Sequence, residues 1–177
     1  MRAEPRDDAE QVTQALRGEP LDVVEVDGGW ARVRTAYAYP GWLRIDELAD
    51  DVDPSWLPSP RDGDPVEEAR AFLGAPYVWG GMTERGIDCS GLVHMAYRRL
   101  GRLVPRDADR QEEAGAQVAE PEAGDLVSYG EDAADHVAFW LGGGRILHAT
   151  GREGVNAVVE EDEPASYRER RRRFFRL

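Results

Sequence analysis

The sequence predicts an α+β protein in which a small all-β unit precedes a larger domain of helices packed on an antiparallel sheet. Three observations support this fold class. The first 50 residues alternate apolar and polar side chains in short stretches broken by glycine, which is typical of antiparallel strands. Two stretches with helical spacing then follow a proline-rich segment, and the later apolar stretches have strand length. Helices first and strands afterwards favour an antiparallel sheet over a parallel α/β fold.

The predicted N-terminal unit contains strands at residues 21–26, 30–34 and 39–43. An Asp-Gly-Gly turn separates the first two strands, as expected for a hairpin. Four prolines, several aspartates and little apolar periodicity lie between Asp50 and Pro65, which indicates a linker. We therefore predict a barrel at residues 1–50, a linker at 51–64 and the larger domain at 65–177.

Two helices are predicted at the start of the larger domain. Residues 66–73 place their apolar side chains at helical spacing before Gly74, and residues 89–100 do so before Gly101. Asp88 stands at the N-cap position of the second helix. The later strands are expected at residues 125–129, 136–141, 145–149 and 155–159, with a closing strand at Phe174 and Phe175.

Composition limits the function classes. The chain has 35 acidic and 22 basic residues and a net charge of −13, and such a negative field repels phosphate backbones and anionic membranes. No stretch reaches the roughly 18 apolar residues of a membrane helix. We expect a monomer with no nucleic-acid partner and no membrane insertion. The first residues lack a secretory signal, so the expected compartment is the cytoplasm as written, or the cell envelope or exterior if such a signal has been removed.

Cys89 is the only cysteine of the chain. It cannot form an internal disulfide, so it is either a buried apolar residue or a reactive thiol. Its predicted place is the first turn of a helix, where unpaired N–H groups and the helix dipole are expected to lower the pKa of the thiol. That position favours a catalytic nucleophile.

A thiol nucleophile needs an imidazole to transfer protons, and the chain has three histidines. His94 is five residues along the predicted helix from Cys89, so its side chain points elsewhere and we expect a packing or surface role. His136 and His148 lie on the two strands of a predicted hairpin. They are therefore the better candidates.

The length of the hairpin loop decides how these two histidines are related. With a three-residue loop Leu141 pairs with Arg145, and both histidines lie on one sheet face as diagonal neighbours. His148 can then orient His136 through a hydrogen bond. A two-residue loop would separate them.

The two histidines could instead bind a metal ion if Asp135 or Asp125 supplied a third ligand. The sequence contains no His-x-His or His-x-x-x-His pair. A cysteine at a helix start is also explained better by catalysis. We expect no metal and no cofactor.

Here the sequence resembles the NlpC/P60 family of cell-wall cysteine peptidases, over residues 66–177. The matching elements are Gly74–Gly81, Gly86–Val93 with Asp-Cys-Ser-Gly, Pro105-Arg106, Gln111, Ala123–Val127, His136–Ala138 and His148-Ala149. The resemblance implies a papain-like core in which Cys89 attacks a carbonyl, His136 transfers the proton and His148 orients His136. Tyr77 and the backbone N–H of Cys89 would face the oxyanion.

The N-terminal residues resemble the bacterial SH3-like (SH3b) modules of cell-wall enzymes, on Gly18-Glu19, Asp27–Trp30 and Tyr39–Leu43. In relatives with such a module, the cleft admits peptides with a free N-terminal L-alanine. The resemblance implies that the ammonium and its peptide contact Asp88, Ser90, Glu19, Tyr39 and Trp79. Alternatively, Tyr77 and Trp79 are core aromatics, Asp88 is only an N-cap and Glu19 is a turn residue.

The implied function is hydrolysis of the γ-D-glutamyl-diamino acid bond in murein peptides by a Cys-His-His mechanism. Three alternatives are an endopeptidase acting on polymeric peptidoglycan, a hydrolase of another amide or acyl bond, and a non-catalytic wall-binding protein. The arginines of residues 168–176 could form a polyanion site. Their alternation around Phe174 and Phe175 favours a final strand with solvated arginines.

Overall fold

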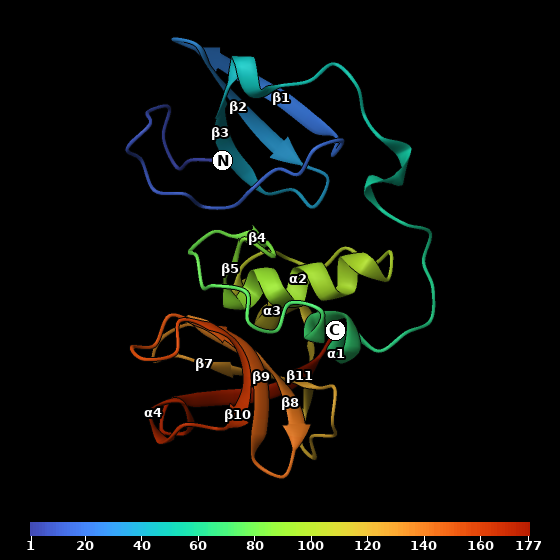
Figure 1. Ribbon diagram of the computed structural model, residues 1–177, viewed down its shortest axis with the longest axis vertical. Coiled ribbons are helices and arrows are strands. Elements are labelled where there is room, and N and C mark those ends of the chain that lie inside the picture. The colour runs from blue at the N-terminus through green and yellow to red at the C-terminus, as the bar shows by residue number, and fades with distance from the viewer.

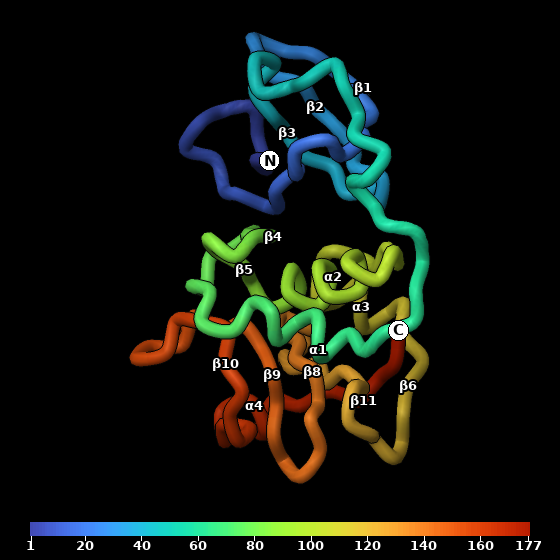
Figure 2. The backbone as a smooth tube through the Cα atoms, turned by 45° about the vertical axis from the view of Figure 1, so that its right-hand side comes forward, coloured from blue at the N-terminus to red at the C-terminus, as the bar shows by residue number.

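The computed structural model describes residues 1–177 and has the predicted α+β architecture. Its N-terminal module, residues 1–50, contains the antiparallel sheet β1-β2-β3. In Figures 1 and 2 this module lies at one end of the molecule, the larger sheet at the other, and helix α2 between them. The strands of the module are β1 (Leu21–Asp27), β2 (Trp30–Thr35) and β3 (Pro40–Arg44), followed by the 3-10 helix η1 (Ile45–Glu47).

The larger sheet has six strands in the order β10-β9-β8-β7-β11-β6, and its neighbouring strands are antiparallel. The predicted closing strand at Phe174 and Phe175 is β11. The six strands are β6 (Ala116–Val118), β7 (Leu126–Tyr129), β8 (His136–Gly142), β9 (Arg145–Thr150), β10 (Ala157–Asp162) and β11 (Arg171–Arg176). The remaining elements are η2 (Pro54–Trp56), α1 (Pro65–Arg70), β4 (Met82–Thr83), β5 (Gly86–Ile87), α2 (Cys89–Arg99), α3 (Ala108–Ala114) and α4 (Ala165–Arg168).

Helix α2 positions the candidate nucleophile. The Asp88 side chain accepts a hydrogen bond from the Gly91 backbone N–H at 2.7 Å, so it is the N-cap that the sequence predicts. At the other end Gly101 has φ +75°, and the Arg102 N–H donates to the Tyr97 carbonyl at 3.0 Å. This left-handed stop terminates the helix. The local signals at both ends therefore place Cys89 in the first turn.

Two predicted elements differ in extent. Helix α1 ends at Arg70 rather than residue 73, because the Phe72 and Leu73 N–H groups donate to carbonyls three residues back and tighten the chain. Strand β10 begins at residue 157 rather than 155, because Asn156 has φ +46° and its N–H closes a turn onto the Arg152 carbonyl.

The β8–β9 hairpin has a two-residue turn, Gly143-Gly144, and a bulge. Gly142 pairs with Arg145, whereas Trp140 pairs with Ile146, so Leu141 is an extra residue in β8. The predicted pairing of Leu141 with Arg145 is therefore wrong. The extra residue restores the register that a three-residue loop would have produced, and His136 and His148 still share one face.

The larger sheet is buried on both faces. The cluster on the helix side contains Leu92, Phe139 and Leu147, and that on the other side contains Tyr129, Trp140 and Ile146. Helices α1 and α2 pack together, and α2 also packs on β8 and β9. None of the helices has the length and apolar character that a membrane crossing requires.

Buried polar contacts join the N-terminal module to the larger domain. Arg98 of α2 forms an ion pair with Glu19 at 3.0 Å, and Arg106 donates to the Thr13 hydroxyl at 3.0 Å. Arg98 also donates to the Trp56 carbonyl of η2 at 3.2 Å. The domain limits at residues 1–50, 51–64 and 65–177 stay a prediction.

Candidate active site

Cys89 lies at the start of α2, is 4% exposed and packs in the main core, and its neighbours Asp88 and Ser90 belong to a buried polar network. The carboxylate of Asp88 accepts from the Gly80 and Gly91 N–H groups, both at 2.7 Å. It also accepts two hydrogen bonds from Arg106, at 2.9 and 2.7 Å. Asp88 is therefore more than an N-cap, because it also ties the preceding loop and a buried arginine to the helix start.

Arg106 connects this network to the module, and its side chain is 1% exposed. It donates to the Ser90 hydroxyl at 2.9 Å, to the Gly81 carbonyl at 3.2 Å and to the Thr13 hydroxyl at 3.0 Å. Sequence reasoning used Arg106 only as part of a motif. The signal that could have revealed its role is Asp88, because a carboxylate buried at a helix start needs a cation beside it. The proposed binding roles of Asp88 and Ser90 thus concern groups that already have buried partners.

The pKa of the Cys89 thiol differs from the value expected from its place in the sequence. Burial, together with the neighbouring Asp88 carboxylate, raises the pKa of the thiol to about 12, although the Val137 N–H, Arg106 and the Ser90 N–H act in the opposite direction. The predicted lowering by the helix start is overturned, because desolvation opposes the charged thiolate and Asp88 offsets the positive end of the dipole. The resting residue is a neutral thiol.

We expect the thiol of the free protein to react slowly with iodoacetamide near neutral pH and faster as the pH rises. A raised pKa leaves less thiolate than in free cysteine, so the rate should increase roughly tenfold per pH unit between about pH 6 and 9. Mass spectrometry of the single cysteine measures this rate. A rate already level near pH 6 would contradict the prediction, because it would indicate a resting thiolate–imidazolium pair.

The two strand histidines contact each other as predicted. Nε2 of His136 and Nδ1 of His148 lie 2.8 Å apart, and the rings meet edge to face. Burial lowers the pKa of both imidazoles, and the neighbouring His148 lowers that of His136 further. Both rings are therefore neutral near pH 7, and Nδ1 of His136 remains as the nitrogen for proton transfer.

The backbone beside His136 approaches the sulfur, and an aromatic ring covers the imidazole. The N–H of Val137, which follows His136, is one of the backbone groups that act on the thiol. Tyr167 stacks on His136 with ring centres 4.5 Å apart. Burial raises the pKa of the Tyr167 hydroxyl, although its hydrogen bond with Thr150 acts in the opposite direction. Strand β8 thus approaches the thiol one residue after His136, and Tyr167 covers the His136 ring. No hydrogen bond joins Cys89 to His136 in the structure, so the transfer between them belongs to the proposal below.

Tyr77 also lies beside the thiol. Burial raises the pKa of its hydroxyl, and negative charge on Cys89, once the thiol is ionised, and on Asp88 raises it further, so the hydroxyl stays protonated and can donate. A Cβ at Gly151 would lie 2.9 Å from the Tyr77 ring, so only a glycine permits this loop to cover it. The ring packs on the main core, and its proposed oxyanion contact stays a prediction.

Trp79 and Tyr39, two further residues predicted to contact the substrate, differ in their exposure and neighbours. Trp79 is 56% exposed, so the alternative of a core aromatic is wrong for it. Tyr39 is half-buried, and burial followed by a hydrogen bond and the charge of Asp107 raises the pKa of its hydroxyl, with Asp88 also contributing. Tyr39 thus lies near Asp107 and is affected by the charges of Arg106 and Asp88.

Glu19 is separated from the thiol. Its side chain is 0% exposed and bonded to Arg98, about 13 Å along α2 from Cys89 by the helical rise. It has no exposed oxygen for a ligand. A carboxylate of the module that does contact a predicted site residue belongs to Glu10, which accepts a hydrogen bond from the Trp79 indole at 2.7 Å. Sequence reasoning missed Glu10, because only the folded N-terminal segment brings it there.

The metal alternative finds no support in the arrangement of side chains. Asp125 pairs with Arg176 at 2.6 Å, and Asp135 pairs with Arg170. No group of three His, Cys, Asp or Glu side chains is placed to hold a metal ion. His94, the third histidine, is buried and bonded through Nδ1 to the Val104 carbonyl at 2.8 Å, which is a packing role.

A second residue that the sequence reasoning missed extends the histidine pair. Nε2 of His148 lies 2.9 Å from the Glu161 carboxylate, which is also bonded to Arg152. Strand β10 supplies Glu161 from beside β9, where Val159 pairs with His148. The sequence signal that could have revealed Glu161 is the acidic stretch after Val159. It was missed because the strand was predicted to end at residue 159, whereas β10 ends at Asp162.

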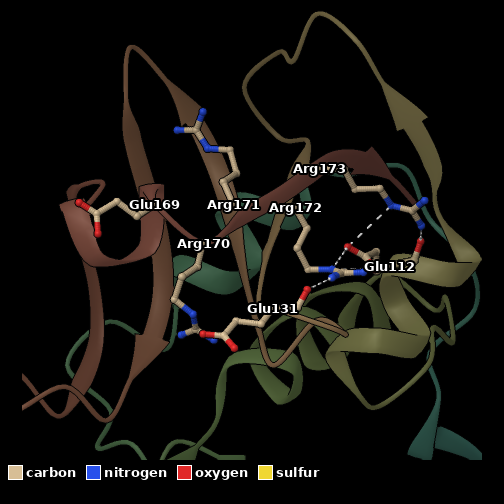
Figure 3. Close-up of a pocket in the computed structure, with 8 residues that line it drawn as sticks. Glu112, Glu131, Glu169, Arg170, Arg171, Arg172 and Arg173 are labelled. Atoms are coloured by element: carbon tan, nitrogen blue, oxygen red, sulfur yellow. Dashed lines mark hydrogen bonds and ion pairs between the residues drawn. The ribbon is translucent and has the colours of Figure 1, made fainter.

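A cavity of about 580 Å³ lies away from this site, at the arginine-rich strand β11. Figure 3 shows Arg172 and Arg173 directed at Glu112, and Arg172 donates to that carboxylate at 3.0 Å. Arg170 and Arg171 pair with Asp135 and Glu163. The arginines are therefore matched by carboxylates, and this cavity does not favour a polyanion.

Comparison with known proteins matches both parts of the chain. The NlpC/P60 family matches residues 74–172, and the bacterial dipeptidyl-peptidase Sh3 domain matches residues 1–48. The chain is 33% identical over 135 residues to a Bacillus subtilis protein named gamma-D-glutamyl-L-lysine dipeptidyl-peptidase, which covers 73% of this chain and 44% of that protein. It is 38% identical over 108 residues to peptidoglycan endopeptidase RipB of Mycobacterium tuberculosis, which covers 52% and 45%.

A solved structure shows the same arrangement. An NlpC/P60 family protein from Bacillus cereus aligns with a TM-score of 0.60 and 28% identity, over 88% of this chain and 53% of that one. This chain spans less than half the length of the curated relatives named above. The resemblances found in the sequence, including that of the N-terminal module, are confirmed.

Proposed function

This chain belongs to the NlpC/P60 family, and we propose that it hydrolyses the γ-D-glutamyl-diamino acid bond of murein peptides with Cys89 as nucleophile. The observation that carries the proposal is Cys89 at the start of α2, where the backbone N–H of Val137 acts on its thiol one residue after His136, which is hydrogen-bonded to His148. The name of the Bacillus subtilis relative supports the bond. The name of the Mycobacterium tuberculosis relative supports the broader class, peptidoglycan peptides.

The proposed reaction begins from a neutral thiol and a neutral imidazole. Nδ1 of His136 accepts the thiol proton as the sulfur attacks the carbonyl carbon, and it later donates that proton to the leaving amine. The Tyr77 hydroxyl and the Cys89 N–H stabilise the oxyanion. The same His136 then takes a proton from water, whose oxygen bonds to the acyl carbon; the carbon–sulfur bond breaks, and His136 returns the proton to the sulfur.

In this proposal the N-terminal module is responsible for the requirement that the substrate have a free N-terminal ammonium. Gln11 donates to the Trp79 carbonyl at 2.8 Å, and the Met82 N–H donates to Gln14 at 2.8 Å, so residues 10–14 lie against the loop that leads to Asp88. Glu10, bonded to Trp79, is then the exposed carboxylate of the module nearest this loop. We assign Glu10 the ammonium contact that the resemblance had assigned to Glu19.

The roles proposed for the remaining predicted contacts follow their positions. Trp79 is exposed beside Glu10 and can cover the alanine side chain of the substrate. Asp88 and Ser90 share the Arg106 guanidinium, so they shape the floor of the pocket through backbone and hydroxyl groups. Tyr39 supports the same network from the module side through Asp107.

N-acetylation of the substrate tests the end-group requirement. We expect acetyl-L-Ala-γ-D-Glu-diaminopimelate to be cleaved with a kcat/KM at least about 100-fold below that of the free peptide, because a carboxylate built to bind an ammonium loses its partner. Glu10→Gln should reduce this discrimination. Glu4→Gln, a change at a surface pair with Arg6, is the matched control.

Mass spectrometry of the products from free and acetylated peptides reports both the bond and the rate. Equal cleavage of the two peptides would remove the ammonium pocket from the proposal and favour intact peptidoglycan as the substrate. In that case, soluble fragments released from purified wall would carry the cleaved bond.

A further inference from the structure

We propose that Glu161, held in place by Arg152, is a positioning residue that sets which nitrogens of His136 and His148 carry protons. The inference rests on the proposed function, because it concerns the same site. It assigns a role to a carboxylate that lies two hydrogen bonds from His136. Residue 161 is the diagonal neighbour of His148 across the β9–β10 pair, since Val159 is directly opposite His148.

The proton arrangement follows from the groups at the outer end of this chain of bonds. A carboxylate can only accept hydrogen bonds, so Nε2 of His148 must donate to Glu161 at 2.9 Å. A neutral His148 then has an unprotonated Nδ1, which accepts from Nε2 of His136 at 2.8 Å. A neutral His136 protonated on Nε2 has its lone pair on Nδ1. Glu161 thereby makes Nδ1 of His136 the base available to the thiol.

Arg152 keeps the acceptor ionised and in place. Its Nη2 lies 2.6 Å from Oε1 and 2.5 Å from Oε2 of Glu161. Burial by itself would raise the pKa of the Glu161 carboxyl, but the hydrogen bonds from Arg152 and His148 bring it below its ordinary value. The carboxylate is therefore charged near pH 7, where both imidazoles are neutral.

The charge of Glu161 also matters once His136 has accepted the thiol proton. His136 becomes an imidazolium when it takes the thiol proton, in a site where burial disfavours that cation. The side chain of His148 is fully buried there too, and the Glu161 anion beyond it stabilises the positive charge on His136 through the two hydrogen bonds. Glu161 thus supplies both the tautomer and part of the counter-charge, although it touches neither substrate nor thiol.

Two substitutions separate the effects on tautomer and charge. Glu161→Leu removes the acceptor and the charge, and Glu161→Gln removes only the charge while its amide oxygen can still accept from His148. Glu160→Leu is the matched control, because Glu160 lies on the same strand and pairs with Arg70 and Arg145 instead. The chain has three histidines, so nitrogen NMR of the labelled imidazoles can assign the protonated nitrogen of each.

We expect Glu161→Leu to abolish the single Nε2–H form of His148 and to lower kcat on the order of 10²-fold with KM within about twofold. This loss is smaller than the roughly 10⁴-fold cost of a wrong tautomer on a base bonded directly to its carboxylate. Glu161→Gln should keep the tautomer and fall between wild type and Glu161→Leu. Glu160→Leu should match wild type in both measurements.

The proposal is overturned if His148 and His136 keep their tautomers in Glu161→Leu, whatever the effect on kcat. NMR spectra and the pH profile of Cys89 alkylation need no substrate, so they decide the question even if no murein peptide is cleaved. A changed tautomer and a shifted alkylation profile in a chain without peptidase activity would retain the role of Glu161 and reject the proposed function.

Discussion

Replacing Cys89 with alanine is expected to abolish cleavage of L-Ala-γ-D-Glu-diaminopimelate, with a loss of kcat on the order of 10⁴- to 10⁶-fold. The sulfur forms the covalent bond of the proposed reaction, and no second cysteine can replace it. The change removes one atom from a residue that is 4% exposed and packed in the core. The fold should therefore persist, which circular dichroism and thermal unfolding can check.

Cys89→Ser is the companion variant, because serine keeps nearly the same volume at this buried position. It should be almost as inactive as the alanine variant. A hydroxyl is a weaker nucleophile than a thiol, and the histidine is positioned to accept a proton from a thiol. Undiminished turnover by Cys89→Ala would reject the peptidase assignment. If both variants still bind insoluble wall as wild type does, binding and hydrolysis are separate properties of the chain.

Replacing Arg106 with methionine is expected to lower the free energy of unfolding by about 3–5 kcal/mol, the usual cost of removing one partner from a buried ion pair. The Asp88 carboxylate would remain buried without a cation, and the hydroxyls of Ser90 and Thr13 would lose their donor. Urea unfolding followed by tryptophan fluorescence measures the change.

Two further variants test the cause of this loss. Asp88→Asn combined with Arg106→Met should recover part of the stability, because no uncompensated charge is then left. Arg110→Met, which breaks an exposed pair with Glu113, should leave the unfolding midpoint unchanged. A midpoint of Arg106→Met equal to that of wild type would show that the buried pair contributes nothing to the fold.

Local signals were sufficient for the α2 segment and for the strand periods. Asp88 at the N-cap, the apolar face and Gly101 are all within 14 residues, so their effect does not depend on the rest of the fold. The strand limits were less certain, because Asn156 adopts a left-handed backbone conformation that the apolar pattern does not reveal. The hairpin shows the same limit, because alternation could not distinguish a three-residue loop from a two-residue turn with a bulge.

The sequence by itself determined the α+β class, the helix start at Cys89 and the pair of strand histidines, because each depends on neighbouring residues and on the period of side chains along a strand. Only the tertiary structure decided the state of the thiol and the partners of the charged groups. Three features depend on segments that are far apart in the chain. They are the desolvation of Cys89, the ion pair of Arg106 with Asp88 and the hydrogen bond between His148 and Glu161. Burial and Coulomb interactions act through space, so a linear pattern does not contain them.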